Sequence, residues 1–319
     1  MISLDQVIGQ QQAVILLRRA IATDQIAPAY LFAGTSGIGR SLAARGFCTE
    51  LMTQGVDAEG QRLIRYKLHK NNHPDLLWVE PTYQHQGKLY TPTQAAEAGL
   101  KRKAPPQIRI EQIRQISQFL ARPALEAPRC MVVIEEAQTM AESPANALLK
   151  TLEEPGNATL VLLAPSADSI LPTLVSRCQK IPFYRLSQAD VGHILTEKGY
   201  QHILEDETIL AIAQGSPGEA IATYELLGNV PQELLQKLKQ MPSSPLQALV
   251  LAKELTAALD TEVQMRLIDY LQYHYWQTTG QRTAIEELEQ ARKYLRGYVQ
   301  PRLVWETFFL KNCKKLAAR

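Results

Sequence analysis

A glycine-rich loop lies directly between an apolar segment and a segment of helical periodicity, and this placement constrains the fold more than any other feature of the chain. The apolar segment covers residues 29–33, and the loop, residues 34–41, reads Gly-Thr-Ser-Gly-Ile-Gly-Arg-Ser. Glycines at this spacing let backbone N–H groups surround a phosphate, and the N-terminus of the following helix adds the positive end of its dipole. The pattern predicts a strand, a phosphate-binding type of loop and a helix, in that order.

Arg40 departs from the usual chemistry of such a loop. A nucleotide-binding loop of this type uses a lysine ammonium to reach the β- and γ-phosphates, and here an arginine stands at that place. A broad planar guanidinium is not equivalent to a compact ammonium group. Two interpretations therefore stay open: the loop holds ATP, or it is a glycine-rich turn kept for its backbone geometry.

Four further apolar segments repeat the strand pattern in the first half of the chain, with segments of helical periodicity between them. The five predicted strands are residues 29–33, 76–79, 130–134, 160–164 and 180–183. This alternation is typical of a parallel sheet flanked by helices. We therefore expect an α/β domain over residues 1–185, with residues 84–99 as an exposed, mobile loop within it.

The strand pattern stops near residue 186, and the remainder of the chain has helical periodicity. Ser187 and Ser216 are suitable N-cap residues, and Pro217 suits a first helical turn. We expect a small three-helix domain over residues 186–240 and an all-helical domain over residues 241–319. The large aromatic side chains of the last domain are expected in its core, with a role as interface anchors as the alternative. They are Trp276, Trp305, Phe308 and Phe309.

The composition excludes several classes of protein. With 45% hydrophobic and 21% charged residues among 319, the chain is globular and long enough for two or three domains. No apolar run approaches the roughly 20 residues that a membrane span needs, and the N-terminus has no export-signal pattern, so a cytoplasmic protein without membrane contact is expected. The four cysteines are scattered without a CxxC pair, which argues against a disulfide framework or a zinc site. A net charge of +2 argues against a protein that coats nucleic acid.

Two adjacent acids, Glu135 and Glu136, follow the strand at residues 130–134. A phosphate-hydrolysing protein places a Mg²⁺-binding Asp and then a water-activating Glu at this point. Glu135 is one methylene longer than Asp, and Mg²⁺ demands near-octahedral geometry, so this is a degenerate metal site or simply a solvated strand end. The candidate ATP and magnesium site consists of Gly34, Thr35, Ser36, Gly37, Ile38, Gly39, Arg40, Ser41, Glu135 and Glu136.

Several segments together resemble bacterial clamp loader subunits of the AAA+ class, over about residues 5 to 225. They are residues 7–10 (Val-Ile-Gly-Gln), 29–34 (Ala-Tyr-Leu-Phe-Ala-Gly), 73–75 (His-Pro-Asp), 146–155 (Asn-Ala-Leu-Leu-Lys-Thr-Leu-Glu-Glu-Pro) and 176–178 (Ser-Arg-Cys). Within the family the likeness is to the delta-prime type of DNA polymerase III subunit. The resemblance implies an AAA+ P-loop domain with a five-stranded parallel sheet, a small three-helix lid and an all-helical C-terminal collar domain.

Four departures from the ATP-hydrolysing gamma/tau subunits point in one direction. Beside Arg40 and Glu135, proline and serine occupy positions 165–166, where a polar sensor 1 residue is expected, and Glu219 lies where a sensor 2 arginine is expected. We therefore expect no hydrolysis in the chain's own site. No cofactor is required there, with ATP and Mg²⁺ as the alternative.

Arg177, in the Ser-Arg-Cys element, is intact. By resemblance it would be an arginine finger that completes the ATP site of a neighbouring subunit, whereas the plainer interpretation is a surface ion pair. The implied partners are the clamp loader gamma/tau and delta subunits, the sliding clamp and primed DNA. The alternatives are a gamma/tau-type motor and a purely structural scaffold.

Two basic segments have no assigned role. Relatives carry a four-cysteine zinc module where this chain keeps only Cys48, so zinc is not expected. In its place, residues 62–70 carry Arg62, Arg65, Lys67, His69 and Lys70. A second cluster occupies residues 101–103. Each is either a solvated surface or a contact with DNA or a partner.

Overall fold

The computed structural model describes residues 3–100, 105–153, 156–280, 282–297 and 299–313. It contains two compact units, residues 1–190 and 191–319, which are described separately. The basic cluster at residues 101–103 and residues 154–155 of the Glu-Glu-Pro segment lie outside the described residues.

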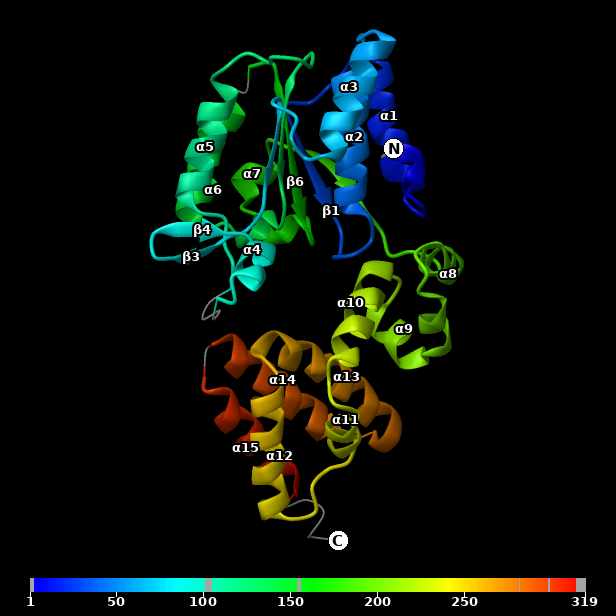
Figure 1. Ribbon diagram of the computed structural model, residues 1–319, viewed down its shortest axis with the longest axis vertical. Coiled ribbons are helices and arrows are strands. Elements are labelled where there is room, and N and C mark those ends of the chain that lie inside the picture. The colour runs from blue at the N-terminus through cyan, green and yellow to red at the C-terminus, as the bar shows by residue number, and fades with distance from the viewer. Residues whose placement is uncertain (1–2, 101–104, 154–155, 281, 298, 314–319) are drawn as a thin grey trace. The chain divides into compact units, whose positions relative to one another are not determined.

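A five-stranded parallel sheet forms the centre of the first unit (Figure 1). Its strands, in the order β2-β5-β6-β1-β7, are Leu76–Val79, Cys130–Ile134, Ala158–Ala164, Ala29–Ala33 and Gln179–Pro182. The predicted α/β fold class and the five parallel strands are confirmed. β6 begins two residues before the predicted segment and β7 one residue before. Every residue of β5 and β6 is buried, because helices cover both faces of the sheet. These strands therefore do not alternate between apolar and polar side chains.

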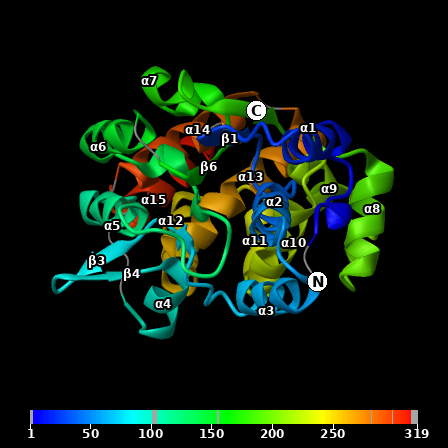
Figure 2. The ribbon, with the colours of Figure 1, turned by 90° about the horizontal axis from the view of Figure 1, so that it is seen from above.

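Two groups of helices cover the sheet (Figures 1 and 2). On one side lie α1 (Gln11–Ala22), α2 (Arg40–Thr53) and α3 (Ala58–His69), and on the other lie α5 (Ile110–Leu120) and α6 (Glu142–Glu153). The short α7 (Pro172–Val175) precedes β7. Three 3₁₀ turns complete the unit: η1 (Leu4–Gln6), η2 (Ala137–Thr139) and η3 (Ala167–Ser169).

The expectation of a mobile loop over residues 84–99 is wrong. Strands β3 (Tyr83–His85) and β4 (Lys88–Tyr90) form an antiparallel hairpin, and α4 (Pro92–Glu97) follows. The two-residue turn has positive φ at Gln86 and Gly87, as a twist-compatible hairpin turn requires. Thr91 and Gln94 form a reciprocal capping box at the start of α4. Local turn and cap chemistry therefore orders this polar insertion.

The secondary-structure elements of the second unit, within its described residues, are all helices. The boundary between the units falls within α8 (Gln188–Glu197), whose start is capped by Ser187 as predicted. The following elements are η4 (Gln201–Glu205), α9 (Glu207–Ala213), α10 (Pro217–Gly228), α11 (Gln232–Lys239), α12 (Pro245–Ala258), α13 (Thr261–Thr279), α14 (Arg282–Arg296) and α15 (Pro301–Cys313). The predicted cap at Ser216 and the first-turn proline at Pro217 are both present. The further division into a lid and a collar stays a prediction.

Aromatic residues of α15 form the centre of the second unit's core. Trp305, Phe308 and Phe309 are buried together with leucines of α12 to α14, as predicted. The prediction is wrong for Trp276, which is 56% exposed. Its neighbour Tyr275 takes the inward position on α13 and donates its hydroxyl to the carbonyl of Leu238 at 2.5 Å.

Within the described ranges, none of the helices combines the length and the apolar character needed to cross a membrane.

Candidate functional site

The glycine-rich loop connects β1 to α2, as the sequence predicts. Gly37 and Gly39 have φ of 74° and 102°, a region that side chains with a Cβ rarely adopt, so both turns depend on glycine. Gly34 has a different reason to be glycine. A Cβ there would lie 2.6 Å from the carbonyl oxygen of Phe183, directly after β7. The loop is therefore seated tightly against the end of the neighbouring strand.

The side chain of Gln10 connects this loop to the segment after β7. Its buried side-chain amide donates to the carbonyl of Ile38 at 3.2 Å and to the carbonyl of Tyr184 at 2.7 Å. Its side-chain oxygen accepts from the N–H of Tyr184 at 3.0 Å. One glutamine thus ties the loop to the chain that leaves β7. The sequence gives no signal for this role of Gln10, since the positions it links lie far apart in the chain.

Arg40 and Glu136 are brought together across the site. Arg40 Nη2 lies 3.3 Å from Glu136 Oε1, and the Arg40 side chain is only 6% exposed. Burial lowers the pKa of Arg40, and the attraction of Glu136 works against that shift. Glu136 sits in the left-handed region with φ of 46°, at the end of the segment after β5. The second residue after the strand thus turns its carboxylate back toward the loop.

Some polar atoms near this ion pair have hydrogen-bond partners, and others have none. Gln138 donates its side-chain amide to Glu136 Oε2 at 2.5 Å, so both carboxylate oxygens have a donor. Among the described residues, Arg40 Nη1 and the hydroxyl of Thr35 are buried without a hydrogen-bond partner. Nearby, burial and the charge of Glu135 raise the pKa of Glu80.

These contacts test whether the site fits a magnesium ion. A divalent cation at Glu136 would have to displace a guanidinium and an amide, and Mg²⁺ accepts only near-octahedral oxygen geometry. No cluster of three or more potential metal-binding side chains occurs in the part of the chain that the structure describes. The residues present therefore do not fit a magnesium site of the hydrolytic type.

Neither Pro165 nor the side chain of Glu219 offers a hydrogen-bond donor to a phosphate. After β6, Pro165 has no N–H, and the carbonyl of Ser166 accepts from the Ser169 hydroxyl at 2.7 Å. Glu219 lies in the first turn of α10, and its Oε2 pairs with Arg266 Nη1 of α13 at 2.5 Å. The carboxylate is thus engaged within the second unit.

Arg177 lies just after α7, at the surface. Its Nη2 is 2.9 Å from Glu153 Oε1 of α6, and its Nη1 donates to the carbonyl of Thr173 at 3.1 Å. The side chain is 39% exposed. These contacts belong to α6 and α7, and none of them reaches the glycine-rich loop. Burial raises the pKa of the adjacent Cys178 thiol to about 11, which disfavours the thiolate at neutral pH.

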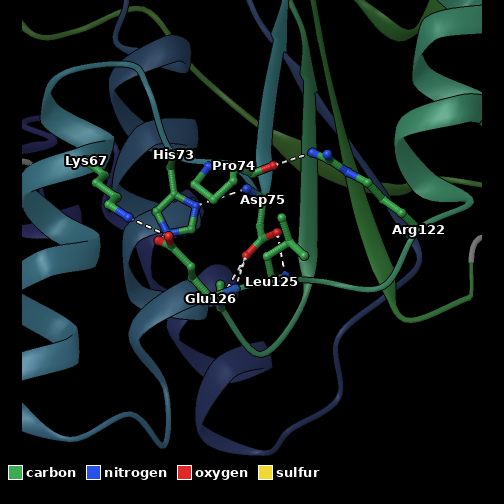
Figure 3. A network of polar contacts seen from close by, with 8 residues as sticks. Lys67, His73, Pro74, Asp75, Arg122, Leu125 and Glu126 are labelled. Carbon is green, nitrogen blue, oxygen red and sulfur yellow. Dashed lines mark hydrogen bonds and ion pairs between the residues drawn. The ribbon is translucent and has the colours of Figure 1, made fainter.

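The His-Pro-Asp triplet forms a buried network of its own before β2 (Figure 3). Asp75 accepts from the backbone N–H groups of Leu125, Glu126 and Ala127 at 2.7 to 2.8 Å. His73 Nδ1 accepts from the N–H of Asp75 at 3.1 Å. Arg122 donates to the carbonyl of Pro74 at 2.6 Å. The triplet therefore fastens the segment before β5 to the start of β2, which is a structural task.

Two family models match the chain, one in each half. Residues 9–187 match the family described as DNA polymerase III, delta subunit. Residues 189–312 match the cyanobacterial DNA polymerase III delta prime, C-terminal domain.

Individual relatives are similar to the chain in sequence, and one solved structure is similar to it in fold. DNA polymerase III subunit delta' of Bacillus subtilis is 31% identical over 196 residues, which are 59% of this chain and 52% of that protein. The subunit of the same name from Pseudomonas aeruginosa is 30% identical over 201 residues, 60% of this chain and 54% of that protein. The chain thus spans about half the length of these curated relatives. A DNA polymerase III gamma subunit-related protein from Thermotoga maritima shares the fold, with a TM-score of 0.55 and 16% identity over 95% of this chain and 99% of that one.

Proposed function

The chain belongs to the DNA polymerase III delta subunit family, and from that premise we propose that it is a delta-prime-like subunit of the clamp loader. It is a stator: it does not hydrolyse ATP in its own site but supports hydrolysis by a neighbouring subunit. In this way it takes part in loading the sliding clamp onto primed DNA. Its partners are gamma/tau and delta subunits, and it works in the cytoplasm.

The ion pair between Arg40 and Glu136 is the observation that carries the first half of this proposal. Hydrolysis needs a carboxylate free to polarise water and a cation free to reach the phosphates. Here each of the two groups is the other's partner, and Glu136 also accepts from Gln138. Both would have to be released before either could act on a nucleotide.

The exposure of Arg177 supports the second half. Arg177 is held at the surface by one carboxylate and one carbonyl, and both it and Glu153 are well exposed. An exposed ion pair is worth only about 0–1 kcal/mol, so Arg177 exchanges Glu153 for a phosphate at little cost. Its planar fork suits a phosphate oxygen pair better than a lysine would.

The experiment is a reconstitution with a gamma-type motor subunit and a delta subunit. DNA-dependent ATP turnover of the assembly is compared for the unaltered chain, Arg177→Ala and Arg177→Lys. We expect turnover to fall by about 10³-fold or more for the alanine variant, as for other arginine fingers, with assembly intact. The lysine variant keeps the charge without the fork and restores little.

Lys180→Ala is the matched control, because Lys180 is exposed on β7 three residues further along. It should leave turnover unchanged. If Arg177→Ala also leaves turnover unchanged, the finger role is wrong. In a parallel assay the purified chain alone is mixed with Mg-ATP. Binding with turnover there would replace the stator by a gamma-type motor.

A further inference from the structure

A cavity of about 340 Å³ lies between α2, α3 and the start of β2. Helices α2 and α3 run side by side along this part of the first unit (Figures 1 and 2). Arg45 and Thr49 of α2 line one wall. The other wall is formed by α3, whose contributions are Arg62, Arg65, Tyr66 and His69. Their spacing of three, four and seven residues places them on one face of the helix.

The cations of this cavity are not neutralised by acids. Among the described residues that line the cavity, none carries a carboxylate. Within the described ranges, neither Arg62 nor Arg65 forms an ion pair. Lys67, which is not among the lining residues, is by contrast paired with Glu126 at 2.5 Å. The unbalanced positive charge of this helix is thus concentrated where the cavity lies.

Arg45 is fixed in place without losing its charge. Its guanidinium carbon stacks 4.2 Å from the ring centroid of Trp78, and Nη1 donates to Asn71 Oδ1 at 2.6 Å. Both contacts are to neutral groups, so they orient the guanidinium and leave its positive charge available. A preoriented arginine at the wall of a cavity loses little conformational freedom when an anion binds.

Tyr66 adds an aromatic surface to this cationic site. Its side chain is 61% exposed although it lines the cavity, and the neighbouring Leu63 is also exposed. Arginines around an accessible aromatic ring are the combination that binds single-stranded nucleic acid. The arginines hold the backbone phosphates, and the ring stacks on an unpaired base. A duplex would not present a base face to this ring.

We propose that this cavity binds a phosphate of single-stranded DNA, with an adjacent base stacked on Tyr66. Arg62 and Arg65 supply the unpaired positive charge, and Arg45 supplies an oriented guanidinium. The choice of DNA rests on the proposed function in replication. The choice of an anionic phosphate rests on the cavity alone.

The test measures binding of a fluorescently labelled oligothymidylate to the purified chain by anisotropy, over a series of salt concentrations. The pocket variant is Arg62→Gln with Arg65→Gln. The control variant is Arg19→Gln with Lys198→Gln, which removes the same charge from two exposed positions elsewhere. We expect about a tenfold loss of affinity for the pocket variant and less than about twofold for the control. The slope of log affinity on log salt should become shallower by about 0.7 for each lost phosphate contact.

Tyr66→Ala separates stacking from charge. It should lower the affinity about tenfold with an unchanged salt slope, and Tyr66→Phe should restore it. An equal loss for the pocket and control variants would overturn the proposal, since it would reflect only overall charge. Duplex DNA that binds as tightly, with no effect of Tyr66→Ala, would overturn the single-strand assignment. Thermal melting verifies that each variant is folded.

This assay contains neither ATP nor any other subunit. Normal trans-activation through Arg177 without oligonucleotide binding would therefore reject the cavity alone. Oligonucleotide binding that depends on the cavity, together with unimpaired turnover for Arg177→Ala, would reject only the stator mechanism.

Discussion

Arg40 Nη2 lies 3.3 Å from Glu136 Oε1, so the cation of the glycine-rich loop and an acid that follows β5 neutralise each other. The guanidinium is nearly buried, whereas the carboxylate is 41% exposed. A buried cation of this kind depends on its partner far more than the exposed partner depends on it. That asymmetry can be measured.

Replacing Glu136 should lower the free energy of unfolding more than replacing Arg40. Glu136→Ala leaves a buried guanidinium without a carboxylate and should lower the free energy of unfolding by about 1–2 kcal/mol, after allowance for solvent screening. Arg40→Met fills the same space without charge and should be nearly neutral. In the Arg40→Met background, Glu136→Ala should cost almost nothing. Urea unfolding of the four proteins completes the cycle, and additive effects would show that the pair does not interact.

In the proposed finger role of Arg177, Glu153 would compete with the phosphate for the guanidinium. Glu153→Gln should change the free energy of unfolding by less than about 0.5 kcal/mol, because the pair is exposed. In the reconstituted assembly it should leave DNA-dependent ATP turnover equal or higher. A fall to the level of Arg177→Ala would mean that Glu153 positions the arginine instead of competing for it.

The carboxylate of Asp75 should contribute strongly to the stability of the first unit. Asp75→Asn points an amide N–H₂ at backbone donors and should cost about 2–4 kcal/mol in urea unfolding. Asp24→Asn, at an exposed position, should change the free energy of unfolding by less than about 0.5 kcal/mol.

Burial acts to raise the pKa of Asp75, but the three backbone N–H bonds and His73 outweigh it, so the pKa lies below its ordinary value. The stabilisation is therefore present above about pH 4 and is lost as the pH falls further.

His73 should give the protein a second, milder pH dependence. Burial lowers the pKa of His73, although Asp75 and Glu126 oppose the shift. The unfolded chain therefore takes up a proton more readily than the folded one, and stability should decline as the pH falls below about 6.5. His73→Asn retains an acceptor for the Asp75 N–H and should flatten the melting temperature between about pH 7 and pH 5. An unchanged slope would exclude His73 as its source.

Gly34→Ala should destabilise the first unit strongly. The new Cβ would meet the carbonyl oxygen of Phe183 at 2.6 Å, and backbone cannot move aside as a flexible side chain can. We expect a loss of about 2–4 kcal/mol in urea unfolding. Gly228→Ala is the control, since its Cβ would meet open space and alanine favours a helix. Equal effects of the two substitutions would contradict the steric explanation.

The sheet was predictable because its strands are short, apolar and separated by helical segments. β6 extends two residues further than expected, since Ala158 and Thr159 pair with β5 although they lie outside the most apolar run. The insertion at residues 84–99 was misread as a mobile loop. Its polar composition concealed the Gln86-Gly87 turn and the Thr91-Gln94 capping box, which need no apolar pattern.

The sequence grouped the glycine-rich loop with the acids after β5, but it did not indicate the contacts between them. The order of strand, loop and helix placed Arg40, and the pair of acids after the strand at residues 130–134 placed Glu136. Their mutual ion pair depends on the left-handed backbone at Glu136, which no pattern in the sequence signals. The roles of Gln10 and Glu153 arise in the same way, from segments distant in sequence that meet only in the folded chain.

The stacking of Arg45 on Trp78 also has an optical consequence. The chain has three tryptophans, and Trp78 alone belongs to the first unit, because Trp276 and Trp305 lie in the second. Replacing Trp276 and Trp305 with phenylalanine would leave an emission spectrum that reports on the first unit only. Its indole ring contacts an arginine that also lines the basic cavity, so a ligand that draws the guanidinium away would alter the intensity of that emission. The protein thus contains an intrinsic fluorophore beside the cavity, and no attached dye is required to follow its occupancy.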